Sequence, residues 1–222
     1  LEYTTSTGAS PLIEPETSSG LETPDTQIDF VQRFAYGITE SLDLEYEIGV
    51  NIFSGSQSVV GLKYQWVGTP SFKSKKGDFH SSIRLRYMGF SGIKDDPNKE
   101  ENIFDDSKFV ENLSAEMYSV SNSFGYNFLD NFMGYIGFQY IKGDIDFRYR
   151  DGGPTGTLID LTRTVDGYGG FAGLSLNIKF NEVFLWKNSL EYEATMLPSP
   201  TRDKNILYES SAFGTSLLFN FD

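Results

Sequence analysis

Apolar and polar residues alternate along most of the chain with a period of two. From Leu42 to Ile52, large apolar residues occupy the even positions, whereas Asp43, Glu45 and Glu47 lie between them. This period puts apolar side chains on one face of an extended strand and polar side chains on the other. Similar segments follow one another from residue 28 to the C-terminus, so the pattern predicts an all-β protein built from successive antiparallel strands.

The spacing of the strands predicts a single up-and-down barrel with short turns at one end and long loops at the other. Nine strands are clear, with short turns at 39–41, 129–131 and 181–182 and long loops that begin at Ser91, Asp151 and Pro198. The 69–78 connection is long for the short-turn end. Single-chain bacterial barrels have an even number of strands. We therefore expect residues 1–5, or residues before Leu1, to supply another strand, which gives ten in total, with eight as the alternative.

The last strand has a mostly aromatic and aliphatic face, formed by Phe213, Leu217, Phe219 and Phe221. It resembles the C-terminal signature strand of bacterial outer-membrane β-barrel proteins, with Phe221 in the place of the terminal aromatic residue. The resemblance implies a transmembrane barrel in the outer membrane, with short periplasmic turns and long outer loops. If the protein is exported, we expect its signal peptide to have been removed, because the first residues lack a basic and an apolar region.

Composition agrees with a barrel and bounds the domain organisation. The 222 residues include 22 Gly, 19 Phe and 13 Tyr but no Cys. A mean hydropathy of −0.32 is compatible with a membrane barrel, since only alternate positions face lipid. We expect a strand and irregular acidic segment at 1–25 and the barrel at 26–222. A soluble β-sandwich is the alternative fold, and the apolar face on almost every strand disfavours it.

The polar face of the strands carries charges of both signs, which a barrel would direct into its lumen. Because buried charges persist only when they are paired, we expect a cross-strand network in which Lys63 meets Glu45 or Glu47 and Lys179 meets Glu191. A mostly plugged lumen is the preferred interpretation, and a narrow water-filled pore is the alternative. The inward charged residues are Asp29, Arg33, Asp43, Glu45, Glu47, Lys63, Arg84, Arg86, Lys179, Lys187, Glu191 and Glu193.

The strand after Phe132 changes the phase of its alternation. Its first apolar residues occupy even positions, whereas Ile145, Phe147 and Tyr149 occupy odd ones. Two interpretations fit this change. Either a β-bulge lies near 141–143, or the strand leaves the bilayer there.

Candidate chemistry is sparse. His80 is the sole histidine, and His80-Ser81-Ser82 resembles the His-x-Ser spacing of outer-membrane lipid A deacylases, in which histidine activates the serine. The preferred interpretation is a lumen histidine without a catalytic role. A two-carboxylate protease site would need further histidine or aspartate clusters at the outer rim. The segment from Asp95 to Asp106 is acidic, and Ca²⁺ binding there is an alternative to solvated charge.

The sequence therefore predicts a function in the envelope without enzymatic activity or a cofactor. The net charge of −13 disfavours a nucleic-acid partner. We predict an integral outer-membrane barrel with a largely plugged, ion-paired lumen, which acts as a structural or partner-binding component. Its partners would be outer-membrane lipid and another envelope protein. The alternatives are a narrow porin-like channel for small solutes and an enzyme that acts on envelope lipids.

Overall fold

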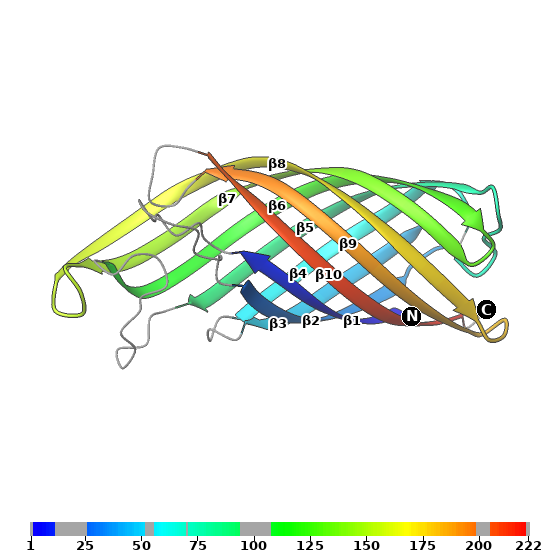
Figure 1. Cartoon of the computed structure of the whole chain (residues 1–222), viewed down its shortest axis with the longest axis horizontal. Helices are drawn as coiled ribbons and strands as arrows, with labels where there is room; N and C mark the ends of the chain where they lie inside the picture. The colour runs from blue at the N-terminus through cyan, green and yellow to red at the C-terminus, as the bar shows by residue number, and fades with distance from the viewer. Residues whose placement is uncertain are drawn as a thin grey trace.

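The computed structural model describes residues 2–11, 26–51, 56–69, 71–93, 108–198 and 205–220. Ten antiparallel strands form one closed barrel, in which each strand pairs with its neighbours in sequence and β1 pairs with β10 (Figure 1). The strands are β1 (Glu2–Pro11), β2 (Thr26–Gly37), β3 (Leu42–Asn51), β4 (Ser56–Val67), β5 (Phe79–Ile93), β6 (Lys108–Leu129), β7 (Phe132–Asp151), β8 (Thr157–Lys179), β9 (Phe184–Pro198) and β10 (Asn205–Phe219).

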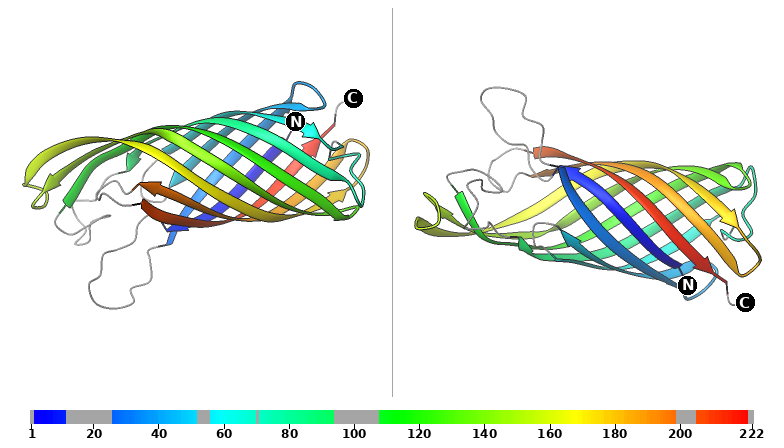
Figure 2. Two further views of the ribbon diagram at one scale, coloured as in Figure 1. Left: turned by 90° about the horizontal axis from the view of Figure 1, so that it is seen from above. Right: turned by 60° about the horizontal axis from the view of Figure 1, so that its bottom comes forward.

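The prediction of a ten-stranded up-and-down barrel is confirmed, and the eight-stranded and sandwich alternatives are wrong. The closing strand β1 runs to Pro11, beyond the five residues expected, and pairs with β10 from Glu2↔Leu218 to Ala9↔Ser211. The sequence pattern had also missed the first half of β8, which begins at Thr157. Two further views show the strands wound obliquely around the barrel (Figure 2).

The two ends of the barrel differ. One end, which we call the turn end, holds both chain termini and the connections after β2, β4, β6 and β8 (Figure 1). The opposite end, the loop end, holds the described connection after β7 and the ends of β1, β3, β5 and β9. β6, β7 and β8 have total lengths of 22, 20 and 23 residues, whereas β3 has 10, and the three long strands project at the loop end. Since about 9–11 tilted residues cross a bilayer, the three long strands continue well beyond it.

An apolar belt surrounds the outside of the barrel. Its exposed large side chains come from β2 to β10, and Phe138 of β7 is 66% exposed. In water such a surface would be unfavourable, whereas hydrocarbon covers it at no cost. Members of the belt include Leu44, Ile48, Val60, Leu62, Ile83, Leu85, Val120, Ile136, Phe138, Leu174, Leu190, Phe213 and Leu217.

Aromatic side chains border the belt at both ends. Tyrosines border it toward the loop end, and three of them hydrogen-bond a carboxylate: Tyr87 with Glu116, Tyr140 with Asp166 and Tyr192 with Glu209. An amphipathic ring bound to a charged group fits a membrane–water interface. On β6, ten residues separate Tyr118 from Phe128, which is about 33 Å of strand and roughly 25 Å of height at a barrel tilt. The aromatics of the turn end are Tyr36, Tyr64, Trp66, Phe79, Tyr126, Phe128, Phe180 and Trp186.

The phase change on β7 marks the point where the wall leaves the belt. The interpretation of a bulge near 141–143 is wrong, because the β6–β7 register is continuous from Leu113↔Phe147 to Asn127↔Met133. Beyond Tyr140 the outward face becomes polar, and Thr164 and Thr162 donate to Asp144 and Asp146 over 2.9 and 2.6 Å. The inward face becomes apolar instead. No helix in the described residues is long and apolar enough to cross a membrane.

Candidate functional site

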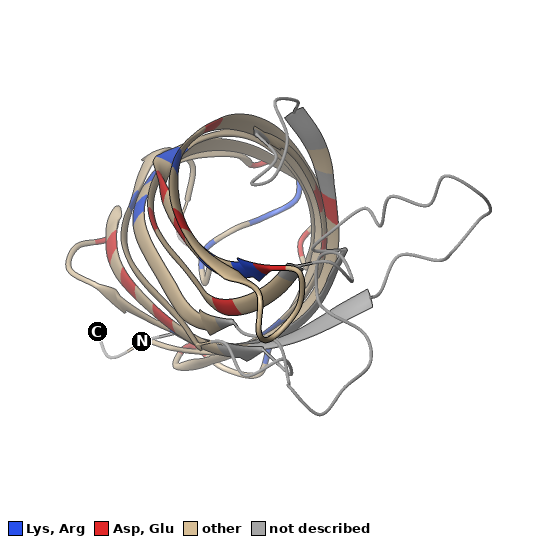
Figure 3. Cartoon of the chain, turned by 90° about the vertical axis from the view of Figure 1, so that its left-hand side faces the viewer, with Lys and Arg blue, Asp and Glu red and all other residues tan. Residues whose placement is uncertain are grey.

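Seen from the loop end, the strands form a ring around a lumen (Figure 3). Buried ion pairs lie on the inward faces of the strands. At the centre of the lumen lies a cluster of three arginines and two glutamates from β2, β3 and β5. Arg33 and Arg86 both pair with Glu47, and the Arg86–Glu47 distance is 3.1 Å. Arg84 Nε lies 2.9 Å from Glu45 Oε2. Both glutamate side chains are only 5% exposed, so the charges are buried and depend on one another.

The strand register decides which acid meets which base. Asp43 is the partner of Lys63 across β3 and β4, and their side chains form a 3.3 Å ion pair. Lys63 lies close enough to Glu45 to act on its charge, as expected. It forms its ion pair with Asp43, however, because the arginines of β2 and β5 hold both glutamates.

The acids of β9 are bound by neutral donors. Glu191 accepts a hydrogen bond from Tyr135, and Glu193 accepts from Gln139 and, over 2.8 Å, from Thr195. Lys179 does not meet Glu191, since it lies at the turn end and pairs with Glu182 at 2.9 Å. In the register of β8 and β9, Lys179 is opposite Leu185, whereas Glu191 is opposite Gly173.

The remaining predicted residues lie elsewhere. Lys187 lines a cavity near the turn end. The side chain of Asp29, the terminal Phe221 and the Asp95–Asp106 segment lie outside the described residues. In the predicted C-terminal signature, Phe213 and Leu217 face outward at 53% and 37% exposure. The ring of Phe219 lies beside that of Phe184, with centroids 5.3 Å apart and the planes tilted by 41°.

An apolar layer fills the inward face on the loop-end side of the charges. Ala115, Met117, Ile141 and Val165 form one buried cluster, and Leu197 packs against it from β9. Val110, Leu113 and Phe147 form a second, with Phe90 of β5 beside it. Sequence reasoning missed this layer, although the polar even positions after Tyr140 carried the signal for it.

The connection between β4 and β5 folds over the turn end, which explains its length. We call its described residues, 69 and 71–78, the cap loop. Lys73 Nζ lies 3.3 Å from Glu40 Oε1, the Lys76 amide donates to Asp130 over 2.8 Å, and Lys179 Nζ donates to the Phe72 carbonyl over 3.3 Å. The cap loop is thus bound to the turn after β2, to the turn after β6 and to the end of β8.

Hydrogen bonds also hold the cap loop internally and against β6. Asp78 accepts from the Lys75 amide at 2.9 Å and from the Thr69 hydroxyl at 2.8 Å, and these bonds lower the pKa of Asp78 below its ordinary value. Asn127, a buried residue of β6, donates to Ser74 and to the Lys75 carbonyl. Gly68 precedes the loop with φ of 109°, and Gly77 lies near its end with φ of 90°, values that favour glycine.

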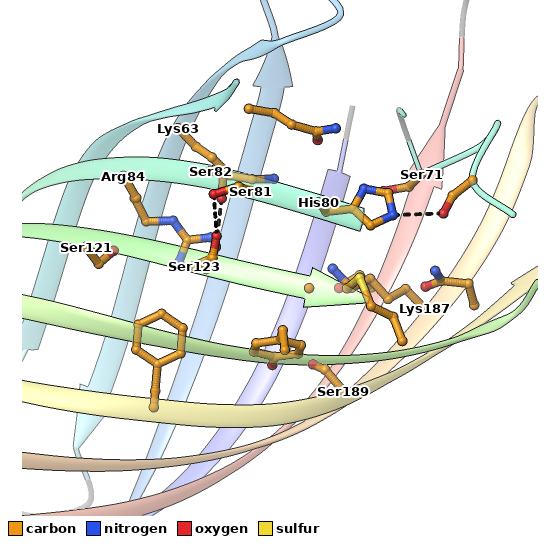
Figure 4. Close-up of a pocket in the computed structure, with 18 of the residues that line it drawn as sticks. Lys63, Ser71, His80, Ser81, Ser82, Arg84, Ser121, Ser123, Lys187 and Ser189 are labelled. Carbon is orange, nitrogen blue, oxygen red and sulfur yellow. Dashed lines mark hydrogen bonds between the residues drawn. The ribbon is translucent and has the colours of Figure 1, made fainter. Parts of the chain in front are cut away.

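The His-x-Ser spacing does not give a catalytic pair. His80 Nε2 lies 3.2 Å from Ser74 Oγ in the cap loop, whereas Ser82 Oγ lies 2.8 Å from Ser123 Oγ (Figure 4). No group of three or more His, Cys, Asp or Glu side chains within the described ranges could hold a metal ion.

The chain is similar to several solved structures at low sequence identity. No family model matches the chain, and no curated protein matches it. Among solved structures, the chain is similar to Neisserial surface protein A at 10% identity and a TM-score of 0.45, covering 98% of this chain and 97% of that one. It is also similar to the KdgM porin in complex with disordered oligogalacturonate, at 11% identity and a TM-score of 0.41, with 100% of both chains covered.

A third similar structure is the N-terminal β-barrel domain of Pseudomonas aeruginosa OprF, at 12% identity and a TM-score of 0.33, covering 97% of this chain and 95% of that one. These values carry no argument about activity. The class follows from the closed barrel and its belt: the chain is a membrane-spanning β-barrel of the outer-membrane type.

Proposed function

We propose that the protein is an integral barrel of the bacterial outer membrane with a closed lumen, which acts as a structural or partner-binding component of the envelope. The burial of the two glutamates of the charge cluster and of the apolar layer carries this proposal. In a water-filled pore these residues would contact water, yet Glu45 and Glu47 are each 4% exposed and Val165 is 1% exposed. Ions would have to displace a paired charge cluster and an apolar layer to pass.

The extension of β6, β7 and β8 supports a role toward the aqueous side of the membrane. Its outer wall carries charged residues such as Asp144, Asp146 and Arg148, which are exposed. A rigid, hydrogen-bonded wall that stands beyond the tyrosine border offers a surface to another envelope component without loss of the barrel's own stability.

The closed lumen predicts that the purified protein produces no stable conductance steps in planar bilayers. The physical reason is that three barriers follow one another along the axis of the barrel. From the loop end, these are the apolar layer, the charge cluster and the cap loop. Incorporation is checked in the same membranes by the resistance of the folded barrel to added protease. Reproducible open steps from the wild-type protein would contradict the closed lumen and favour the channel.

A narrow channel is the second candidate, because the lumen contains a cavity of about 170 Å³ between the charge cluster and the cap loop. A matched variant distinguishes the narrow channel from the closed lumen. The double change Glu45→Ser/Arg84→Ser removes one buried ion pair without leaving an uncompensated charge. We expect it to remain silent if the apolar layer also blocks the lumen, whereas a channel should conduct more through the wider section.

A further inference from the structure

The cavity at the turn end has a lining of one charge sign. It is bounded by the cap loop on one side and by the charge cluster on the other, and side chains of several strands reach into it (Figure 4). Among its described lining residues are four cations, the histidine and no aspartate or glutamate. The basic and histidine residues of the lining are Arg33, Lys63, His80, Arg84 and Lys187.

The arrangement of the ion pairs explains how a protein of net charge −13 presents a cationic cavity. The side chains of Arg33 and Arg84 keep 28% and 27% exposure, whereas the glutamates with which they pair keep 5%. The carboxylates therefore lie behind the guanidinium groups. Lys63 is 27% exposed and pairs with Asp43, which is 33% exposed but is not among the residues that line the cavity. Bases rather than acids therefore meet whatever occupies the space.

Hydroxyl groups complete the lining. Ser71 and Ser74 come from the cap loop, Ser82 from β5, and Ser121 and Ser123 from β6. A serine hydroxyl can donate a hydrogen bond to an anionic oxygen and accept one from a neighbour, as Ser82 and Ser123 do with each other.

The rings of Phe171 and Tyr135 lie at the side of the cavity and leave its centre open. A Cβ atom at Gly137 would collide with the ring of Phe171, and one at Gly173 would collide with the ring of Tyr135. The two glycines therefore let both rings lie against the wall instead of across the lumen. The remaining volume of about 170 Å³ has space for a small anion and several water molecules.

We propose that this cavity is a binding site for a small oxyanion of the size of phosphate, held by Lys63 and Arg84 and by the serine hydroxyls. A planar guanidinium and an ammonium group suit the oxygens of such an anion, and charge-assisted hydrogen bonds are the strong ones. The inference goes beyond the closed lumen and does not depend on it, because a site between the cap loop and the charge cluster can be occupied whether or not ions cross the barrel.

The test measures binding of inorganic phosphate to the full chain in detergent micelles, by calorimetry at low ionic strength. We expect saturable binding near one phosphate per chain. The double variant Asp43→Asn/Lys63→Gln removes an acid and a base together, and we expect it to weaken binding by about tenfold or more. The variant Ser82→Ala/Ser123→Ala should weaken it by a smaller factor. Lys142→Gln, on the exposed outer wall, is the control and should bind as the wild type does.

Three results would overturn the site. The wild type could show no saturable binding. The double variant could bind phosphate as tightly as the Lys142→Gln control, with both folded by circular dichroism. Chloride could compete at the same concentration as phosphate, which would identify an ordinary counterion. Silent bilayers combined with phosphate binding would support the site and the closed lumen together, whereas open channels with phosphate binding would overturn only the closed lumen.

Discussion

Replacing Glu47 by alanine should destabilise the barrel by about 3–5 kcal/mol, the usual effect of removing one partner from a buried ion pair. Glu47 is the shared partner of Arg33 and Arg86. Without it, three arginines would face Glu45 alone in the middle of the lumen. The measurement is urea unfolding of the barrel from lipid vesicles, followed by tryptophan fluorescence.

The matched control is Glu40→Ala at the turn end. Glu40 also forms an ion pair, with Lys73 at 3.3 Å, but these side chains are 71% and 61% exposed. Exposed pairs contribute at most about 1 kcal/mol, so the control should unfold close to the wild type. An equal, small effect of both substitutions would show that water reaches the cluster and that the lumen is open.

Replacing Phe138 by arginine should destabilise the protein in vesicles by about 2 kcal/mol, since a cation on the lipid face costs about 2–4 kcal/mol at the midplane of the bilayer and less toward the tyrosine border, which begins at the next outward residue, Tyr140. Phe138 is among the most exposed apolar side chains of the described chain, at 66%. In a water-soluble protein the same change would have almost no effect, because an exposed arginine is well solvated. The large predicted effect therefore depends on lipid as the medium.

Thr162→Arg serves as the control on the neighbouring strand. Thr162 lies on the same outer surface, beyond the tyrosine border, where it donates to Asp146. An arginine there remains in water beside a carboxylate, and we expect a change within about 1 kcal/mol. If Phe138→Arg were as mild as Thr162→Arg, the apolar belt would not be in contact with hydrocarbon.

The sequence was sufficient to predict which side chains of the barrel wall face outward and which face inward. Alternation assigns Leu85 outward and Arg84 and Arg86 inward, and the structure exposes Leu85 on the outside while Arg84 and Arg86 pair with glutamates inside. The tally of turns also predicted the tenth strand. These features are local, since they follow from the period of the strand and from the need to close its edges.

The pairings could not be predicted from alternation alone. A shift of two residues in register keeps every side chain on its face but changes its partner, which is why Lys63 meets Asp43 instead of Glu45. The fold of the cap loop depends on Glu40 and Asp130, which come from two other turns, and on Lys179 at the end of β8. Such long-range contacts leave no periodic trace in the sequence.

The reversal of the pattern beyond Tyr140 was visible but had two interpretations. A bulge and an exit from the bilayer both move apolar residues to the other parity. Only the continuous register of β6 and β7 decides in favour of the exit. The outward side of the extension faces water and carries Lys142, Asp144 and Asp146. The inward side is apolar and carries Ile145 and Phe147.

The most direct test of the account is spin-label accessibility along β5, for which the absence of cysteine makes single-cysteine variants straightforward. Labels at residues 83 to 87 would be measured in vesicles with oxygen, which partitions into lipid, and with a water-soluble nickel complex. The account predicts that labels at Ile83, Leu85 and Tyr87 respond to oxygen, whereas labels at Arg84 and Arg86 respond to neither reagent. Strong access of the nickel complex to positions 83, 85 and 87 would contradict the membrane-spanning barrel.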